Sequence, residues 1–286
     1  MEGLSKETTK AGRLQRACLV LLREHEADGA LPTSIRFLFY ELLDRGVIPK
    51  VYRKADGTAR PRTPGQDISD AVGVLREAAL IPWDWIVDET HTLHDWRYAA
   101  TVYDYVEDTL RLARIDLWDG EPPPLILCES RSLAGVLRVI AADYLCPIAA
   151  TNGQAGGFLH TKVAPLIAGT QSRRVLYLGD LDLSGGHIES NTRNVLASYA
   201  PLDWTRVAIT RAQVEEHGFE VKTKTDHRYK DVAVHGAVET EALGQVEIMR
   251  LLTEALEERV SEPLAVIRER EERQRVQVRV LLDAEG

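Results

Sequence analysis

The sequence predicts an α/β protein in which an N-terminal helical unit is followed by a mainly parallel sheet flanked by helices. Apolar residues recur at helical spacing through the N-terminal part of the chain. Further on, two short and continuously apolar runs, 125–128 and 175–178, are typical of strands that are covered on both faces. A helical pattern at 133–144 lies between them, which gives the strand–helix–strand alternation of a parallel sheet.

The N-terminal unit is expected to hold three helices and a short strand. The first helix covers 8–26, and the second begins after a cap at Thr33 or Ser34. A third helix is expected at about 67–79, followed by a strand at 81–87 in which apolar residues alternate with others. Three helices and a strand suggest a winged-helix or other helix-turn-helix unit, a class that binds DNA, although small helical bundles share this pattern.

The chain is long enough, at 286 residues, for two domains that each bury a core. We expect residues 1–95 to form the winged-helix domain and residues 121–286 to form the α/β domain with its C-terminal helices. The segment 96–120 links them and is expected to hold a helix at 98–115. Consecutive prolines at 122–124 mark the boundary between linker and second domain.

Composition restricts the class of protein. No apolar stretch approaches the roughly 18 residues of a membrane span, and the N-terminal residues do not resemble a secretory signal. We therefore expect a cytoplasmic protein with no membrane partner. The three cysteines are widely spaced and form no Cys-x-x-Cys pair, which favours reduced thiols in the core over disulfides or a zinc site.

A net charge of -9 is unusual for a protein that binds nucleic acid, because phosphate contacts normally draw on surplus lysine and arginine. One segment departs from this balance, with five basic residues against a single acid. We expect it to be a mobile loop that contacts DNA, although a solvated loop without a partner fits the segment equally well. The five basic residues are Lys50, Arg53, Lys54, Arg60 and Arg62.

Acidic residues follow each of the two predicted buried strands. Glu129 comes after the first, and Asp180 and Asp182 come after the second. Because parallel strands end at the same edge of a sheet, these three carboxylates are expected to converge. Converging carboxylates repel one another unless a cation compensates, and Mg²⁺ needs only one or two of them besides water and phosphate oxygens. The pattern predicts a site for Mg²⁺, or for Mn²⁺ in its place, although an Asp-x-Asp pair alone is often a turn that caps a helix.

The acidic motif resembles that of a known domain. Glu129, followed by Asp180-x-Asp182-x-x-Gly185-x-x-Ile188, looks like the toprim domain. Its spacing is similar to that in the topoisomerase VI A-subunit family, which includes the meiotic double-strand-break protein.

Two further segments resemble the same family, a glycine-rich turn at 152–157 and the segment 239–243, Glu-Thr-Glu-Ala-Leu. The resemblance covers most of the chain in order but rests on short motifs. It implies a winged-helix domain before a toprim domain, bound Mg²⁺, and double-stranded DNA as the substrate.

In that family a tyrosine nucleophile lies in an Arg-acid-aliphatic-aromatic-Tyr string. This sequence offers Arg36-Phe37-Leu38-Phe39-Tyr40, with Phe37 where the family usually has an acid. Helical geometry places Tyr40 roughly 130° from the apolar stripe, so it is expected to point out of the core. Arg36 lies one turn behind Tyr40, where a guanidinium can steady developing charge or help the phenol ionise.

The reaction implied by the resemblance is that of a type IIB topoisomerase. Tyr40 attacks a DNA phosphodiester and forms a 5′-phosphotyrosyl link, while the metal held by Glu129, Asp180 and Asp182 stabilises the phosphate. A homodimer is implied, in which the tyrosine of one protomer meets the metal site of the other, as is a nucleoid-associated location. Strand passage needs a separate ATPase subunit, because this chain has no Gly-x-x-x-x-Gly-Lys loop.

Two alternatives remain open. The first is a hydrolytic nuclease of the toprim type, as in some defence systems, in which water attacks and Tyr40 only contacts DNA. The second is a non-catalytic DNA-binding or assembly protein that keeps the fold. Only the topoisomerase-like reaction leaves the protein covalently attached to DNA.

Overall fold

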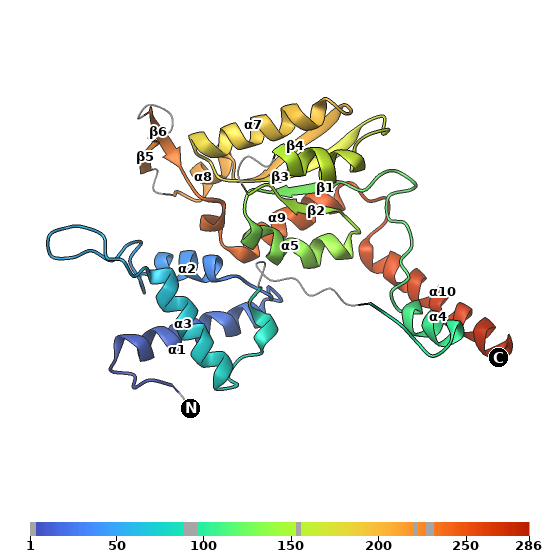
Figure 1. Cartoon of the computed structure of the whole chain (residues 1–286), viewed down its shortest axis with the longest axis horizontal. Helices are drawn as coiled ribbons and strands as arrows, with labels where there is room; N and C mark the ends of the chain where they lie inside the picture. Colours follow the sequence, from blue (N-terminus) through green and yellow to red (C-terminus); the bar gives the residue numbers. More distant parts are fainter. Residues whose placement is uncertain (1–3, 88–95, 153–155, 220–221, 227–231, 286) are drawn as a thin grey trace.

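A computed structural model describes residues 4–87, 96–152, 156–219, 222–226 and 232–285 (Figure 1). The described residues form a helical N-terminal unit, an α/β layer, and a pair of helices that extends from it (Figure 1). The elements in chain order are α1 (Lys10–Ala27), α2 (Ile35–Asp44), α3 (Pro64–Glu77), η1 (Trp83–Trp85), α4 (Val102–Leu110), β1 (Leu125–Cys128), α5 (Arg131–Asp143), β2 (Ile148–Ala150), α6 (Gly156–Phe158), η2 (Leu159–Val163), η3 (Ala164–Leu166), β3 (Arg173–Leu178), α7 (Leu183–Ala197), β4 (Leu202–Ala208), α8 (Arg211–Glu216), β5 (Lys222–Asp226), β6 (Val232–Ala237), η5 (Thr240–Leu243), α9 (Gln245–Glu257) and α10 (Leu264–Glu285).

The three predicted N-terminal helices are present as α1, α2 and α3. Ser34 caps α2 by accepting the N–H of Phe37 at 3.2 Å, and Thr63 forms a capping box with Gln66 at the start of α3. The helices pack their apolar faces together, so this unit has a core of its own. Its buried members include Leu14, Cys18, Leu21, Leu22, Leu38, Leu42, Ile68, Val72 and Leu75.

The strand predicted at 81–87 is wrong. Trp83–Trp85 form one turn of 3-10 helix. Of residues 81–87, all of which the structure describes, only Ile86 forms a β-bridge, an isolated parallel one with Thr33. Pro82 has no N–H to give to a ladder, and the exposed Trp83 lies under the guanidinium of Arg76 instead of on a sheet face. The structure therefore gives three helices without confirming a winged helix.

The basic segment between α2 and α3 is more ordered than a plain loop. Arg53 and Ala59 form an antiparallel bridge, and two further backbone hydrogen bonds close a short hairpin: Lys54 N–H to Thr58 O and Arg60 N–H to Tyr52 O, both 2.8 Å. We call residues 52–60 the basic hairpin.

The second half of the chain forms the predicted parallel sheet. The described strands of this sheet are all parallel, in the order β2-β1-β3-β4, and β1 pairs with β3 from Leu125↔Val175 to Cys128↔Leu178. Every residue of β1 is buried, as the continuous apolar run predicted.

Helices cover both faces of this sheet (Figure 1). Ile126 and Leu176 face the core shared with α5 and α9, whereas Leu127 and Tyr177 face η2 and α7. The layered arrangement leaves the ends of the strands as the open edge of the sheet.

The linker helix is shorter than the predicted 98–115, because α4 covers Val102–Leu110. It packs along α10, and the two extend away from the sheet (Figure 1). The predicted C-terminal helices are present as α9 and α10. The cysteines Cys18, Cys128 and Cys146 are buried and unpaired, as expected. Within the described ranges, no helix combines the length and apolar character needed to cross a bilayer.

Helix α2 belongs to two cores at once. Leu38 lies in the core of the helical unit, whereas Phe37 is fully buried in the core of the α/β layer. The amide of Gln245, at the start of α9, donates to the carbonyls of Ala30 and Pro32 just before α2. These contacts hold the first turn of α2 over the carboxyl edge of the sheet.

Candidate active site

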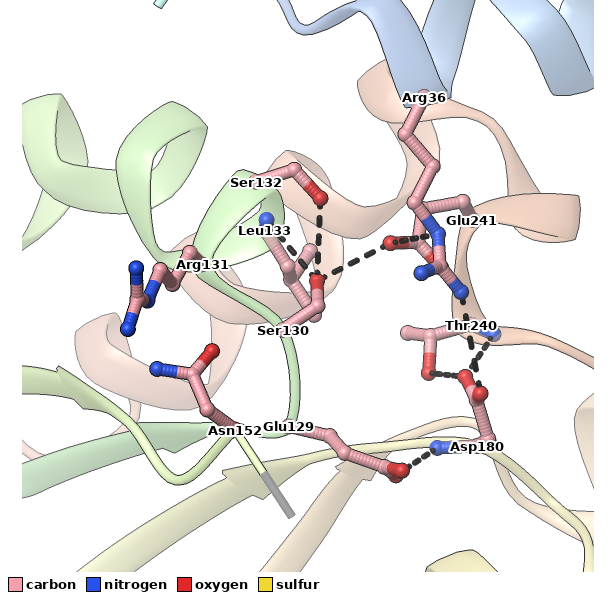
Figure 2. A pocket seen from close by; sticks show the side chains of 10 residues that line it. All are labelled: Arg36, Glu129, Ser130, Arg131, Ser132, Leu133, Asn152, Asp180, Thr240 and Glu241. Carbon is pink, nitrogen blue, oxygen red and sulfur yellow. Dashed lines mark hydrogen bonds and ion pairs between the residues drawn. The ribbon is translucent and has the colours of Figure 1, made fainter. Parts of the chain in front are cut away.

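Two of the predicted acids meet where neighbouring parallel strands end. Glu129 directly follows β1, and Asp180 comes two residues after β3. The backbone N–H of Asp180 donates to Oε2 of Glu129 at 2.9 Å, so the turn after β3 is bonded to the acid after β1 (Figure 2). The convergence expected from the strand order is present for this pair.

Asp182 is turned toward α7. Its Oδ1 accepts the N–H of Gly185 at 2.7 Å and so caps the helix. Its charge still acts on the site, because it contributes to the raised pKa of Glu129. The sequence could not decide between a helix cap and a site residue, and the structure gives Asp182 the capping contact.

Gly185 allows α7 to approach the acidic turn. A Cβ at this position would lie 2.4 Å from the carbonyl oxygen of Asp180 and 3.2 Å from Oε2 of Glu129. The first distance is far below any tolerable contact with backbone, so only glycine fits here. The next residue, Gly186, has open space at the same point.

The segment 239–243 forms another wall of the site. Oδ1 of Asp180 accepts the backbone N–H of Thr240 at 2.9 Å and its hydroxyl at 3.1 Å. Just before it, Leu181 and Val238 exchange two backbone hydrogen bonds of 2.8 and 3.0 Å. This pairing brings Glu239 and Glu241 to the site, and the sequence had indicated them only through the family resemblance of their segment.

Arg36 reaches into these acids from α2 (Figure 2). Its Nε lies 2.8 Å from Glu241, and its Nη2 lies 3.3 Å from Glu239 and 3.9 Å from Asp180. Glu241 is only 1% exposed and also accepts the hydroxyl of Ser130 at 3.1 Å. A buried carboxylate is costly without a positive partner, so the ion pair with Glu241 fixes the guanidinium of Arg36 at the site.

The charged form of Glu129 is disfavoured by its surroundings. Burial, followed by the charge of Asp180, raises the pKa of Glu129 to about 7. Burial also raises the pKa of Glu241, against the opposing effect of Arg36. Arg36 lies 2.8 Å from Glu241 and 3.3 Å from Glu239, and of the acids that raise its own pKa Glu241 acts most strongly and Glu129 least.

A cavity of about 530 Å³ opens above these groups. The acids line one side (Figure 2). Arg131 and Ser132 at the start of α5, with Asn152 after β2, line the other. Of the glycine-rich turn at 152–157, residues 153–155 lie outside the described residues.

Tyr40 lines a second cavity, of about 730 Å³, which shares Arg36, Arg131 and Ser132 with the first. The side chain is half-buried and faces this cavity, in agreement with its predicted position off the apolar stripe. Its ring centroid lies 5.9 Å from Cζ of Arg36. Phe37, in the position of the family's acid, points the other way into the α/β core, where a carboxylate would be costly.

The five basic residues of segment 50–62 do not act as one group. Lys50 lines the second cavity and lies 3.6 Å from Glu239. Arg53 and Arg60 donate to carbonyls within the basic hairpin, and Arg62 pairs with Asp67 and Asp70. Lys54 is exposed on the hairpin. Only Lys50 is therefore placed at the site itself.

The donor set fits a magnesium ion only in part. Among the described residues, no three or more His, Cys, Asp or Glu side chains form a metal-binding cluster. Glu129 and Asp180 nevertheless bring carboxylate oxygens from adjacent strands into one cavity, and the raised pKa of Glu129 indicates uncompensated charge. Two carboxylates suffice for Mg²⁺ when water and substrate phosphate complete the shell. The predicted triad with Asp182 stays a prediction.

Comparison of this chain with protein-family models, with curated proteins and with solved structures finds no match.

Proposed function

We propose that the protein is a metal-dependent DNA strand-breaking enzyme, similar in chemistry to the topoisomerase VI A subunit, with Tyr40 as its nucleophile. One observation carries the proposal: Glu129 and Asp180 meet at the sheet edge beside Arg36, which comes from the same helix as Tyr40. Carboxylates and a phenol, in two adjoining cavities that share the guanidinium of Arg36, are groups that phosphoryl transfer to tyrosine requires.

The proposed reaction is a transesterification. The phenolic oxygen of Tyr40 attacks the phosphorus, a Tyr–O–P bond forms, and the bond from phosphorus to the 3′ oxygen breaks. The phenolic proton ends on the 3′ oxygen, so no water is consumed and the 5′ phosphate stays on the protein. Arg36 donates hydrogen bonds to the phosphate oxygens as negative charge develops there. Glu129 and Asp180 would hold a magnesium ion, which would supply Lewis-acid stabilisation of the developing charge.

The cavity walls suit a nucleic-acid backbone. Lys50 and Arg131 place positive charge beside the cavity of Tyr40, and the exposed Lys54 lies on the adjoining basic hairpin. We propose double-stranded DNA as the substrate, a homodimer as the working form, a separate ATPase subunit for any strand passage, and action at the nucleoid in the cytoplasm.

The deciding experiment measures whether cleaved DNA carries covalently attached protein. Supercoiled plasmid is incubated with the protein and Mg²⁺ or Mn²⁺, stopped with detergent, and resolved before and after protease digestion. We expect nicked or linear DNA that carries protein, and none of it with Tyr40→Phe or Glu129→Gln. Tyr105→Phe, on the distant and partly exposed α4, is the matched control and should behave as wild type.

The other outcomes separate the alternatives. If Tyr40→Phe still cuts DNA and no product carries protein, the enzyme is a hydrolytic nuclease. If wild-type protein binds DNA but leaves the plasmid intact under all metal conditions, the catalytic proposal is wrong and a binding or assembly role replaces it.

A further inference from the structure

A charged side chain outside the proposed reaction reaches the turn that carries Asp180. Arg206 lies near the end of β4, opposite Tyr177 of β3. One extra residue, Val207, follows it before the ladder resumes, which makes a β-bulge at the carboxyl end of the strand. Bulges next to functional sites redirect side chains, and at this bulge the side chain of Arg206 is directed toward the turn after β3.

The guanidinium of Arg206 meets four acceptors. Its Nη2 donates to the backbone carbonyls of Gly179 and Asp180 at 2.6 and 2.8 Å, and its Nε donates to the carbonyl of Ile209 at 2.8 Å. Its Nη1 pairs with the carboxylate of Glu189 on α7. One side chain therefore joins the turn after β3, the end of β4 and α7.

One peptide unit connects this guanidinium to the acids. It consists of the carbonyl of Gly179, which accepts from Arg206, and the N–H of Asp180, which donates to Oε2 of Glu129 at 2.9 Å. Because a peptide is planar, a donor that fixes the direction of its carbonyl also fixes the direction of its N–H. Hydrogen bonds in such a chain polarise one another. Arg206 therefore orients the contact between the two carboxylate residues through a single peptide bond.

The peptide on the other side of Asp180 is bonded as well. Its carbonyl is the second one that accepts from Arg206, and Oδ1 of the Asp180 side chain accepts the N–H of Thr240 at 2.9 Å. Burial and the charge of Asp180 raise the pKa of Glu129, and the charge of Arg206 opposes that rise. Both the geometry and the charge of Arg206 therefore favour two ionised carboxylates side by side.

Arg206 is itself fixed in one orientation. Its partner Glu189 also accepts the indole N–H of Trp204 at 2.8 Å. Cζ of Arg206 lies 5.5 Å from the centroid of the fully buried Tyr177 ring. The arginine and Glu189 are largely buried, at 18% and 19% side-chain exposure. A guanidinium held in this way is preorganised to support the groups that it contacts.

We infer that Arg206 is a positioning residue of the carboxylate pair, which holds the peptide between Gly179 and Asp180 so that Glu129 and Asp180 present their oxygens to one ion. The inference rests on the proposed function for the ion and the reaction, whereas the contacts with the turn do not depend on it. A lysine cannot replace Arg206, because one ammonium group lacks the planar fork that meets two carbonyls and a carboxylate together.

Two variants and two controls of the full chain test this role. Arg206→Lys keeps the charge but loses the planar fork. The double variant Arg206→Met with Glu189→Met removes both charges, so that neither is left buried without its partner and the chain can fold. Glu189→Gln keeps the carbonyl contacts of Arg206 and an acceptor for Trp204, and Arg193→Met removes an exposed arginine from the same helix.

The first measurement is hydrogen exchange in metal-free protein, resolved at single amides by NMR. In both Arg206 variants we expect the amide of Asp180 to exchange faster by about tenfold or more, while amides of β1 keep their wild-type rates. The second measurement is calorimetric titration with Mg²⁺. We expect the affinity of both variants to fall by about 10- to 100-fold, as for other residues that orient metal ligands, and the controls to bind as wild type does.

Wild-type exchange at Asp180 in the double variant, or wild-type behaviour of Arg206→Lys in both measurements, overturns the inference. Faster exchange throughout the sheet also overturns it, because Arg206 would then stabilise the fold in general. If the wild type binds no Mg²⁺ and cuts no DNA, the proposed function fails, whereas the exchange measurement still decides whether Arg206 holds the turn.

Discussion

At the scale of residues, burial and neighbouring acids disfavour the charged form of Glu129. Its pKa of about 7 lies above the ordinary value of 4.5, so the folded protein holds a proton that the unfolded chain releases. The stability associated with that proton is present below pH 4.5 and is lost as the pH rises toward 7. In metal-free protein, Glu129→Gln should therefore be more stable than wild type by about 1–2 kcal/mol above pH 7, after allowing for solvent screening.

Urea unfolding at pH 5 and pH 8, with a chelator present, measures this difference. The advantage of Glu129→Gln should shrink at the lower pH, and added Mg²⁺ should raise the midpoint of wild type more than that of the variant. Equal midpoints at pH 8 would show that Glu129 is not under electrostatic strain.

Gly185 and Gly186 form a matched pair. Gly185→Ala places a methyl group against the Asp180 carbonyl and the Glu129 carboxylate, so we expect a loss of roughly 1–3 kcal/mol in stability and a loss of cleavage. Gly186→Ala has open space in the same helix and should be neutral or stabilising by up to about 1 kcal/mol. Thermal unfolding and plasmid cleavage measure both variants, and an active Gly185→Ala would show that the close approach of α7 is unimportant.

At the scale of elements, Asp182 combines a cap with a charge. Asp182→Ala should cost about 1 kcal/mol through loss of the cap on α7, whereas Asp182→Ser keeps a capping oxygen and should stay close to wild type in stability. If the charge also helps to hold the metal, both variants weaken Mg²⁺ binding to a similar degree. Calorimetric titration separates the effects, because unchanged affinity in Asp182→Ser limits Asp182 to capping.

Helices and strands whose burial follows a regular apolar pattern could be predicted from the sequence. The two buried strands follow from continuous apolar runs, and α2 follows from its stripe and its Ser34 cap. The strand expected at 81–87 failed because alternation alone does not report that Pro82 lacks a donor or that Trp83 is exposed beside Arg76. The pattern of apolar residues along the sequence does not contain information about these contacts.

Part of the candidate site could also be predicted. Glu129 and Asp180 converge because strand order dictates it, and their strands are recognisable. Glu239 and Glu241 are brought in by the pairing of Leu181 with Val238, a long-range contact without a periodic signal. The sequence did not indicate Phe37 as a core residue, because a single apolar stripe was taken to mean that α2 packs on one side only. In the structure α2 packs against both the helical unit and the α/β layer.

For the whole molecule, Phe37 joins the helical unit to the α/β layer. Phe37→Ala should lower the free energy of unfolding by about 3–5 kcal/mol, because it removes a fully buried side chain. It should also lower cleavage, since the first turn of α2 positions Arg36. Val20→Ala, on an exposed site of α1, is the control and should change stability by less than about 0.5 kcal/mol. Full cleavage by a destabilised Phe37→Ala would mean that the position of Arg36 does not depend on this contact.

The bridge between Leu181 and Val238 has a mechanical consequence. Val238 follows β6, and β6 pairs with β5 in a hairpin at the periphery of the α/β layer (Figure 1). Leu181 lies between Asp180 and Asp182, so this bridge joins the peripheral hairpin to the turn that carries both aspartates. A displacement of β6 is therefore expected to move that turn as well.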